Sequence, residues 1–392
     1  MKKYLLIAVA LVLVPFGALA GGKYDIEVMT QNQYLGADLT PIVAAPDGIT
    51  FNQEVIKTLA SIANNNLPER AVALADSILE RYPHLVALQE VFSFGCIETG
   101  TIPGACRLFA AAFNDHLGAT LAALNHDSDN YRVVGTVQNL TLPGLPVYLD
   151  LDVFPDILVT VIDRDVILAR HDVTAEPVNF YCLRPSVDGC NFALENTVIV
   201  PTALGPVINI ERGFVGVDAV VNGEHYRFVN THLEVKFPAP NPGAPFFQAA
   251  QASELLFTLT LMAPTPSGSR LLVVGDFNSS PDQPPWPHPV DGPYLNPYQQ
   301  FTMGTLLTGA AISAPYADIW NLRPGKPPGY TCCQAADLMN ATSIHDERID
   351  LFFAMPAPTA VKANVLDNKP DDKTATGLWP SDHSSVSARF NY

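Results

Sequence analysis

The sequence predicts a mixed α/β (α+β) fold built as one large domain. Apolar runs typical of strands alternate along the chain with segments whose apolar residues recur at helical spacing. Two alternating runs flank Asn222-Gly223, a pair that suits a tight type I′ turn, so a purely parallel sheet is excluded. No repeat and no shift in composition marks a linker, so we expect a single domain with inserted surface loops.

The first two elements after the N-terminal segment are expected to be a strand and a helix. Residues 24–35 (YDIEVMTQNQYL) alternate apolar and polar side chains, as a half-buried strand does. Residues 68–82 (PERAVALADSILERY) begin with a proline, which the first turn of a helix tolerates, and carry apolar residues at helical spacing. The same patterns predict further strands at 84–92, 131–140, 157–170, 271–274, 348–353 and 384–390, a hairpin at 217–234 and a second long helix at 246–263.

The N-terminal segment has the parts of a secretory signal peptide. Two lysines precede an apolar run, and Ala18-Leu19-Ala20 forms a small-x-small cleavage pattern. Pro15 and Gly17 interrupt the run, and no later stretch reaches the roughly 20 apolar residues that a membrane span needs, which disfavours an anchor. We therefore expect residues 1–20 to be removed and the mature chain, residues 21–392, to be secreted or periplasmic.

Charge and cysteine content further narrow the possible binding partners and the state of the cysteines. The formal net charge of −17 disfavours tight, sequence-independent binding of nucleic acid, although a bound divalent cation would reverse the local field. Six cysteines in an exported chain favour disulfides, and two pairs bracket short loops, although spacing alone does not fix the pairing: Cys96 with Cys106, and Cys182 with Cys190. Cys332 and Cys333 are adjacent, which leaves open a vicinal disulfide or two thiols with other partners.

Acids, amides and histidines follow the apolar runs at the ends of several predicted strands. They are Asn32, Glu90, Asn230, His232, Asp276, Asn278 and Asp350, with Asp382 and His383 just before the last strand. If these strands lie side by side, their ends meet at one rim, where α/β sheets build sites. Carboxylate and amide oxygens suit Mg²⁺, Mn²⁺ or Ca²⁺ far better than zinc. The set predicts metal-assisted attack of water on a phosphate ester.

The order of these motifs resembles that of the endonuclease/exonuclease/phosphatase superfamily, which includes DNase I-like nucleases, neutral sphingomyelinases and inositol polyphosphate 5-phosphatases. The motifs are Thr30-Gln31-Asn32, Gln89-Glu90, Asn230 to Leu233, Gly275 to Asn278, Arg348 to Asp350 and Ser381 to His383. Their joint order over nearly the whole mature chain carries the resemblance. It implies a DNase I-like four-layer architecture, in which two mixed β-sheets pack as a sandwich flanked by helices, and it makes residues 21–392 one catalytic domain.

The resemblance also implies which residues hold the ion and the water. Glu90 is expected to be the principal metal ligand, with Asn32 and Asp382 helping to hold Mg²⁺ (or Mn²⁺ or Ca²⁺). Asp276 is expected to orient or deprotonate the attacking water, and Asn278 to contact the phosphate.

Two histidines are expected to act on the phosphate and the leaving group. His383 is expected to bond the scissile phosphate, with its ring fixed by Asp350, and His232 to protonate the leaving oxygen. The expected substrate contacts are Asn32, Asn230 and Arg212, the last on a loose match to a basic residue before a glycine.

Substrate selection is expected in two long segments that fit no motif, near residues 138–210 and 281–345. The acidic composition and an aromatic, proline-rich loop at 284–301 favour a sphingomyelinase-like or other small phosphodiester substrate, with peripheral contact to a membrane surface. The same motif residues are also compatible with the alternative of an extracellular endonuclease that acts on DNA or RNA. An alternative that is not an enzyme is a catalytically silent secreted binding protein with the same fold. No feature indicates an obligate protein partner.

Overall fold

The computed structural model describes residues 25–100, 102–150, 154–199, 207–236, 243–263, 268–287, 293–325 and 327–392. The predicted signal peptide at residues 1–20 lies outside these ranges. No helix within the described ranges combines the length and the apolar character that crossing a bilayer requires. The described strands form two large sheets and a separate two-stranded one.

The first large sheet contains the earliest and the latest strands of the chain. Its strands are β1 (Ile26–Asn32), β2 (Leu85–Gln89), β3 (Ser93–Glu98), β4 (Tyr131–Val147), β5 (Ile157–Arg170), β16 (Ala360–Val365) and β17 (Val386–Asn391). They run in the order β16-β17-β1-β2-β5-β3, and β4 also pairs with β5. β1 and β2 are parallel, with Asn32 opposite Gln89, so both strands carry their carboxyl ends to the same edge.

The second large sheet has the same arrangement of a central parallel pair. Its strands are β6 (Thr174–Pro177), β7 (Arg184–Ser186), β8 (Gly189–Asn191), β11 (Gly213–Val221), β12 (Glu224–His232), β13 (Arg270–Asp276), β14 (Ala317–Asp318) and β15 (Asp350–Met355). They run in the order β14-β15-β13-β12-β11-β8-β7, with β6 also on β11. β12 and β13 are parallel, with His232 opposite Asp276, and the predicted hairpin joins β11 to β12. Its turn residues, Asn222 and Gly223, both have positive φ, as expected.

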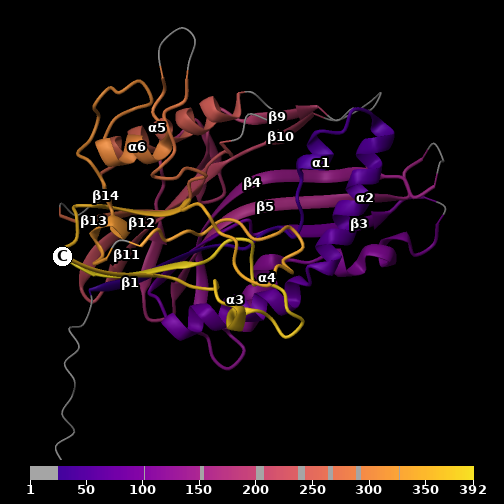
Figure 1. Ribbon diagram of the computed structural model, residues 1–392, viewed down its shortest axis with the longest axis horizontal. Helices are drawn as coiled ribbons and strands as arrows, with labels where there is room; N and C mark the ends of the chain where they lie inside the picture. Colours follow the sequence, from indigo (N-terminus) through magenta and orange to yellow (C-terminus); the bar gives the residue numbers. More distant parts are fainter. Residues whose placement is uncertain are drawn as a thin grey trace, which may run out of the picture.

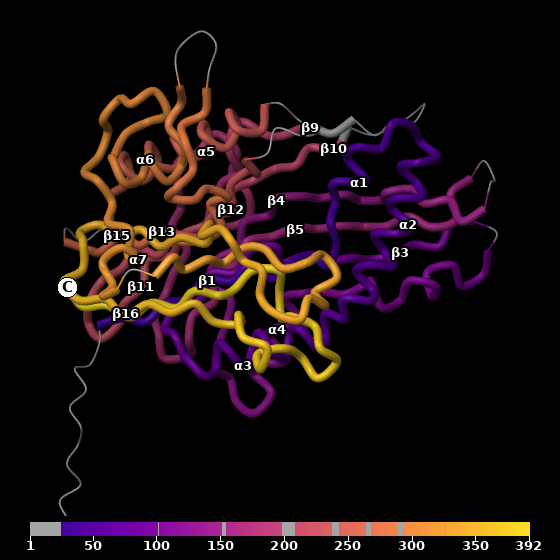
Figure 2. The backbone as a smooth tube through the Cα atoms, in the orientation of Figure 1, coloured from indigo at the N-terminus to yellow at the C-terminus, as the bar shows by residue number. Residues whose placement is uncertain are grey.

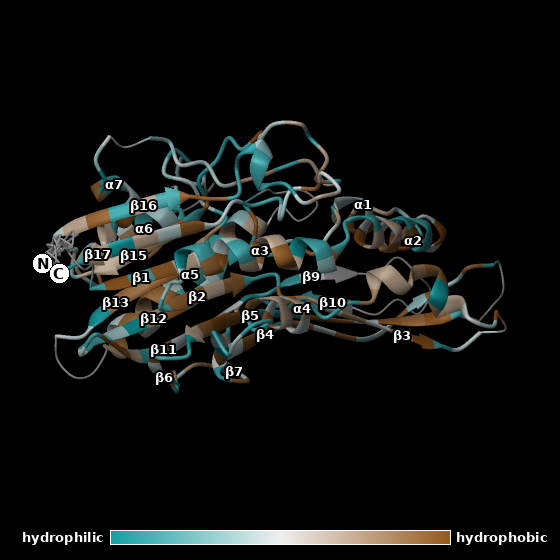
Figure 3. Ribbon diagram, turned by 90° about the horizontal axis from the view of Figure 1, so that it is seen from below, coloured by the Kyte–Doolittle hydropathy of each residue, from teal (hydrophilic) through white to brown (hydrophobic). Residues whose placement is uncertain are grey.

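The main core lies between the two sheets, and strand alternation explains how the chain fills it. Leu85 and Ala87 of β2 point into this core, whereas Val86 and Leu88 point to the opposite face. Phe228 and residues of β13 and β15 supply the core from the second sheet. Figure 3 shows the apolar stretches following the strands of both sheets. Every central strand therefore needs apolar residues on both faces, which is why these strands read as nearly continuous apolar runs.

Helices cover the outer faces of both sheets. α3 (Leu67–Arg81) and α4 (His116–Leu124) pack on the first sheet, and α5 (Ala244–Leu261) and α6 (Pro297–Met303) pack on the second. Figure 1 shows the two helix pairs on opposite sides of the strands. The order helices, sheet, sheet, helices confirms the predicted four-layer fold class, and α3 and α5 confirm the two long helices expected from the sequence.

The hairpin of β4 and β5 is longer than the rest of its sheet and carries a third apolar cluster. Figure 2 shows it extending toward α1 (Thr40–Val43) and α2 (Gly48–Asn64). α2 and η1 (Ala105–Ala112) pack there against β3 and the distal part of the hairpin. The segment 138–210, which fits no sequence motif, thus contains the end of β4, all of β5 to β8, and the small sheet of β9 (Asn196–Ile199) and β10 (Val207–Ile210). The two remaining short helices are α7 (Ile319–Leu322) and η2 (Pro370–Asp372).

All six cysteines are paired in disulfides. Cys96 pairs with Cys106 and Cys182 with Cys190, the two loop-closing pairs that the spacing suggested. Cys332 and Cys333, for which the sequence left two alternatives open, form a vicinal disulfide.

Candidate active site

Six chain segments bring the predicted polar residues to one end of the sandwich. Asn32 ends β1, and Glu90 directly follows β2. His232 ends β12 and Asp276 ends β13. β15 and β17 run antiparallel to their neighbours, so their starting ends meet the same rim, which brings in Asp350, Asp382 and His383. The carboxyl ends of both parallel pairs therefore form the floor of one site.

Asn32 joins the two sheets at the centre of the site. Its Nδ2 donates to Glu90 Oε1 and to Asp276 Oδ2, each at 3.1 Å, and its Oδ1 accepts from Tyr34 N at 2.9 Å. Asn32 is fully buried, so each of its polar atoms needs these partners. The amide thus fixes the distance between Glu90 on the first sheet and Asp276 on the second.

The strand β13 leaves the sheet through a conformation that only glycine adopts easily. Gly275 has φ +135°, and a Cβ at this position would lie 2.0 Å from the carbonyl oxygen of Thr231. Asn278 then takes a left-handed φ of 48°, and its backbone N–H donates to Asp276 Oδ1 at 2.8 Å. The Gly275 to Asn278 motif is therefore a turn that aims the Asp276 carboxylate into the site, which explains why a core strand ends on a carboxylate and an amide.

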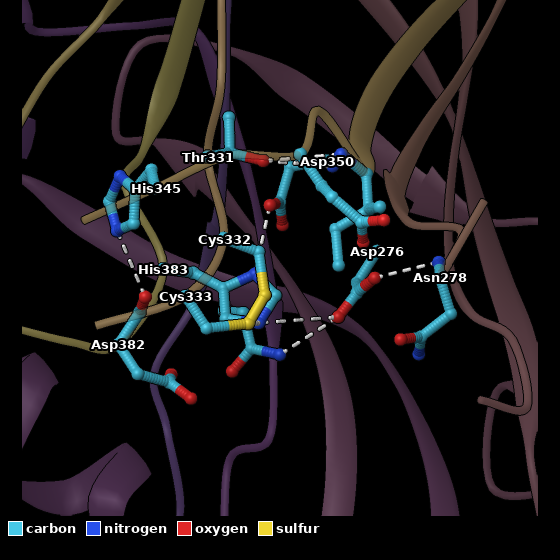
Figure 4. Close-up of a disulfide and its surroundings, with 12 residues drawn as sticks. Asp276, Asn278, Thr331, Cys332, Cys333, His345, Asp350, Asp382 and His383 are labelled. Carbon is cyan, nitrogen blue, oxygen red and sulfur yellow. Dashed lines mark hydrogen bonds and ion pairs between the residues drawn. A yellow bond between two sulfur atoms is a disulfide. The ribbon is translucent and has the colours of Figure 1, made fainter. Parts of the chain in front are cut away.

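His383 lies between the carboxylates of Asp350 and Asp276, as Figure 4 shows. Its Nδ1 lies 2.9 Å from Asp350 Oδ2, and its Nε2 lies 3.8 Å from Asp276 Oδ2. Burial works against a charge on the ring, but Asp350, Asp382 and Asp276 outweigh it and raise the pKa of His383 well above its usual value. The ring is thus a cation at neutral pH, with Nδ1–H directed to Asp350 and Nε2–H directed into the site.

His232 lies on the other side of Asp276 and has the opposite charge state. Arg212 Nη1 lies 2.9 Å from His232 Nδ1, and because a guanidinium only donates, Nδ1 must accept. Burial, Arg212 and His383 together lower the pKa of His232 well below its usual value. The proton of the neutral ring is therefore on Nε2, which lies 3.4 Å from Asp276 Oδ2. Asn278 Nδ2 lies 3.2 Å from the same nitrogen and donates to the carbonyl oxygen of Leu233 instead. A neutral imidazole is a good hydrogen-bond donor, but losing its last proton would leave an imidazolate, so the geometry favours a donor over the predicted acid.

Of the predicted metal ligands, Asn32 is buried, and Glu90 and Asp382 are half-buried. Glu90 Oε2 accepts from Leu35 N at 2.9 Å, while Ser381 beside Asp382 donates from Oγ to the carbonyl oxygen of Asn32 at 2.7 Å. Burial raises the pKa of Asp382 and of Asp276 to about 7 each, with the Glu90 carboxylate adding to both shifts.

These oxygen-rich surroundings fit a hard divalent cation. Carboxylates outnumber the cationic side chains, so an ion would neutralise them, and carboxylate and amide oxygens are the ligands that Mg²⁺, Mn²⁺ and Ca²⁺ prefer. In the part of the chain that the structure describes, Asp276, Asp350 and His383 also bring their ligand atoms within 4.8 Å of one another.

The predicted role of Asn230 needs correction. Its side chain is fully buried, and its Nδ2 donates to the carbonyl oxygens of Leu88 and Val166 at 2.9 and 3.1 Å. Its Oδ1 accepts from Gln89 Nε2 at 2.6 Å. Every polar atom of this amide is used to join the second sheet to the first, so Asn230 supports the site from below and offers no open face to a substrate.

Several residues that support the site carry no motif in the sequence. Arg70 of α3 is 1% exposed and donates to the carbonyl oxygens of Gln33 and Pro380 at 2.8 and 2.9 Å, which ties the loop after β1 to the loop before β17. Burial lowers its pKa to about 10, so it stays charged at neutral pH. His345 lies against Asp382 and bonds its carbonyl oxygen at 3.1 Å. These contacts link residues from 37 to 310 positions apart, so no local pattern could reveal them.

Two further acids lie below the site on one strand. Asp163 and Asp165 of β5 are both buried, and their spacing of two places them on the same face, toward the second sheet. Burial raises the pKa of Asp163 to about 7, and burial with the charge of Asp163 raises that of Asp165 well above its usual value. Burial disfavours the charge on Arg212, but Glu234, Asp163, Glu90 and Asp165 outweigh it and raise its pKa. The acids thus keep Arg212 charged beside His232.

A cavity of about 680 Å³ lies next to the segments that carry the site residues. Lys236 follows the His232 segment, Ser280 follows Asn278, and Arg348 precedes Asp350, and all three line the cavity. The walls are aromatic, proline-rich and acidic, and include Trp286, Trp320, Tyr330, Asp282, Asp346 and Glu347. The described part of the 281–345 segment, which was expected to select the substrate, forms much of this wall.

Comparison with known proteins identifies the family of the chain. The model of the Endonuclease/Exonuclease/phosphatase family matches residues 122–383. No curated protein matches by sequence. Similar solved structures include a mannosyl-6-phosphatase of Bacteroides thetaiotaomicron, at 13% identity and TM-score 0.49, over 94% of this chain and 100% of that one. Truncated Caenorhabditis elegans TDP2 has 12% identity and a TM-score of 0.46, over 94% of this chain and 97% of that one. The catalytic domain of human Nocturnin has 16% identity and a TM-score of 0.45, over 93% of this chain and 94% of that one.

Proposed function

The chain belongs to the endonuclease/exonuclease/phosphatase family, and from this premise we propose that it is an exported, divalent-metal-dependent phosphoesterase that hydrolyses a small or lipid-derived phosphodiester. One observation carries the proposal. Short contacts link Glu90 through Asn32 to Asp276, and Asp276 to His383 and its partner Asp350, so the acids and the imidazolium surround one space. This is the set that water attack on a phosphate ester requires.

Each side chain has a task that follows from its protonation state. A bound divalent ion, held by Glu90, Asn32 and Asp382, would supply charge neutralisation at the phosphoryl oxygens. Asp276 has a pKa raised to about 7 by burial, which suits a base that takes a proton from water at neutral pH. His383 donates from Nε2 to a phosphoryl oxygen while Asp350 holds its ring. Neutral His232 donates a second hydrogen bond from Nε2.

The cavity beside the site supports a small substrate over a nucleic acid strand. Asp282, Asp346 and Glu347 line it, against Lys236 and Arg348. Lys236 is already paired with Glu347, and Arg348 with Asp318. Such a surface has little free positive charge to bind a second phosphate of a polyanion. Aromatic rings next to carboxylates instead suit a compact neutral or cationic group attached to the phosphate.

Export is the second part of the proposal. The signal-peptide pattern in residues 1–20 supports it, and the three disulfides are of the kind that persist in oxidising compartments. Contact with a membrane surface belongs to the proposal only for the lipid-derived substrate.

Hydrolysis of matched substrates tests the proposal. The mature chain would be assayed on bis(4-nitrophenyl) phosphate, 4-nitrophenyl phosphate, liposomal sphingomyelin and plasmid DNA, each with Mg²⁺, Mn²⁺ or Ca²⁺ and with a chelator. We expect the diester to be cleaved faster than the monoester, a small or liposomal diester faster than DNA, and all turnover to stop on chelation.

Contrary results separate the alternatives. Faster cleavage of plasmid DNA than of every small or liposomal diester would identify an extracellular endonuclease. A protein that melts at a higher temperature with the ion but hydrolyses none of the substrates would be a silent binding protein.

A further inference from the structure

The vicinal disulfide lies directly against the histidine of the site. Cys333 is exposed, and its Sγ is 3.9 Å from His383 Nε2, the nitrogen that faces the reaction space. Cys332 is buried, and the ligand atoms of Cys332, Cys333 and His383 all lie within 4.8 Å of one another. Figure 4 shows the two sulfur atoms beside the His383 ring. The proposed function uses neither sulfur.

Backbone hydrogen bonds hold the cysteine pair in this place from both sides. Gln334 N donates to the carbonyl oxygen of Asp382, and Ser384 N donates to that of Thr331, each at 2.8 Å. The residues that flank the two cysteines are thus bonded to the residues that flank His383. The sulfur atoms would stay beside the ring if the bond between them were cleaved, because these two hydrogen bonds do not depend on it.

We propose that reduction of the Cys332–Cys333 bond creates, with His383 Nε2, a binding site for a thiophilic cation such as Zn²⁺, and that the oxidised pair keeps such cations out of the active site. Thiolate and imidazole ligands select zinc-like ions, in contrast to the oxygen ligands of Glu90, Asn32 and Asp382. Typical Zn–S and Zn–N bonds place tetrahedral ligand atoms about 3.6 Å apart, close to the observed separation of Cys333 Sγ and His383 Nε2.

The chemistry of the site balances with a small thiol as the reductant. Two thiol molecules transfer two electrons, so one protein disulfide becomes two protein thiols while the reductant becomes its own disulfide. Zinc binding then releases the two thiol protons and the proton of His383 Nε2. Asp350 accepts from Nδ1, which leaves Nε2 as the nitrogen for the metal, in the usual carboxylate-histidine-zinc order.

Occupation of this site removes His383 from the proposed reaction. A cation bound to Nε2 replaces the proton that Nε2 donates to the phosphoryl oxygen. Turnover therefore stops even when Mg²⁺ is present. This consequence rests on the proposed function, whereas the zinc site itself does not. Zinc inhibition that appears only after reduction is therefore the signature of the proposal.

Zinc binding and turnover are to be measured separately on the mature chain. The protein is reduced with a thiol under anaerobic conditions, desalted, titrated for thiols, and given Zn²⁺ in competition with a chromophoric zinc indicator. We expect one additional Zn²⁺ per reduced chain relative to the oxidised chain, and at least a tenfold loss of turnover of bis(4-nitrophenyl) phosphate in Mg²⁺, reversed by a zinc-selective chelator.

Matched variants distinguish this cysteine pair from the others. The double variant Cys332→Ser, Cys333→Ser should retain turnover but lose both the additional zinc and the inhibition. Cys96→Ser, Cys106→Ser should keep both, because that pair joins β3 to η1 in a different cluster. If the first double variant does not fold, Cys333→Ser alone removes one sulfur ligand and should weaken zinc binding at least tenfold.

The outcomes decide the two proposals independently. Equal zinc binding by the reduced wild type and the cysteine variant overturns the site. Zinc bound at the pair without loss of turnover overturns its link to activity. Zinc bound by a protein that never hydrolyses a diester keeps the site and refutes the proposed function instead.

Discussion

His383 Nδ1 and Asp350 Oδ2 lie 2.9 Å apart at the bottom of the site, although they are 33 residues apart in the chain. Both side chains are buried, and the carboxylate is the leading cause that keeps the ring charged. The pair therefore sets both the direction and the charge of the Nε2–H group. Because the two residues act as a unit, their losses should not add.

The first prediction tests this unit. Asp350→Asn should lower kcat on bis(4-nitrophenyl) phosphate by about 10- to 100-fold, since the ring loses its orienting partner. Combining it with His383→Ala should cost no more than His383→Ala alone. Asp218→Asn serves as the control, because Asp218 pairs with Arg227 away from the site. Multiplicative losses in the double variant would show that the two residues act separately.

The second prediction concerns Glu90. Glu90→Gln keeps the shape of the side chain but removes the charge that attracts a hard cation, so the Mg²⁺ concentration for half-maximal turnover should rise at least about tenfold. The increase in melting temperature on adding Mg²⁺ should also disappear. Glu80→Gln, on the exposed side of α3, should behave as wild type. An unchanged Mg²⁺ response in Glu90→Gln would place the ion elsewhere.

The third prediction separates a donor from an acid at His232. Because Arg212 and burial keep this ring neutral, His232→Gln, which retains an N–H donor, should keep at least about tenfold more kcat than His232→Ala. A pKa well below 6.5 means that the ring stays neutral as pH rises from 6 to 8, so kcat should not fall in that range on account of His232. A descending limb between pH 6 and 8 that is lost in His232→Gln would instead show a protonated acid.

The fourth prediction tests the corrected role of Asn230. Asn230→Leu leaves the carbonyl oxygens of Leu88 and Val166 without donors between the sheets, so the free energy of unfolding should fall by about 2–4 kcal/mol. KM for the diester should stay within about twofold, since the amide faces no substrate. Urea denaturation and steady-state kinetics measure the two effects. A large rise in KM without loss of stability would restore the substrate contact.

The fifth prediction concerns the pH dependence of stability. Asp367 is 4% exposed, and burial raises its pKa to about 6, although hydrogen bonds from Ser385 and Ser77 oppose the shift. The folded protein therefore binds this proton more tightly than the unfolded chain. Its contribution to stability is greatest below pH 3.8 and is lost as pH rises to about 6.

Removing the charge should remove this dependence. Asp367→Asn should raise the free energy of unfolding at pH 8 by up to about 3 kcal/mol, and by much less at pH 4.5. Denaturation by urea at both pH values measures the difference, with the exposed Asp371→Asn as control. An equal gain at both pH values would mean that the effect is not electrostatic.

Much of the fold follows from local sequence patterns. The helices α3 and α5, the β11–β12 hairpin and the strands β1, β2, β5 and β13 all lie where apolar spacing and turn residues predicted them. The rest of the segment 138–210 is different, because β6, β7 and β8 within it have only three or four residues each. Short strands carry too few residues for a clear period, so only their pairing in the sheet reveals them.

The sequence by itself determined which residues gather at the candidate site, because residue types and their positions after apolar runs are local properties: Glu90, Asp276 and His383 could be chosen as candidate site residues from the sequence alone. Only the tertiary structure decided which partners surround them. Arg212 sets the proton of His232, Asn230 turns inward between the sheets, and the Cys332–Cys333 disulfide lies on His383. These relations join residues that lie far apart in the chain, and they depend on direction and burial, which a linear pattern does not contain.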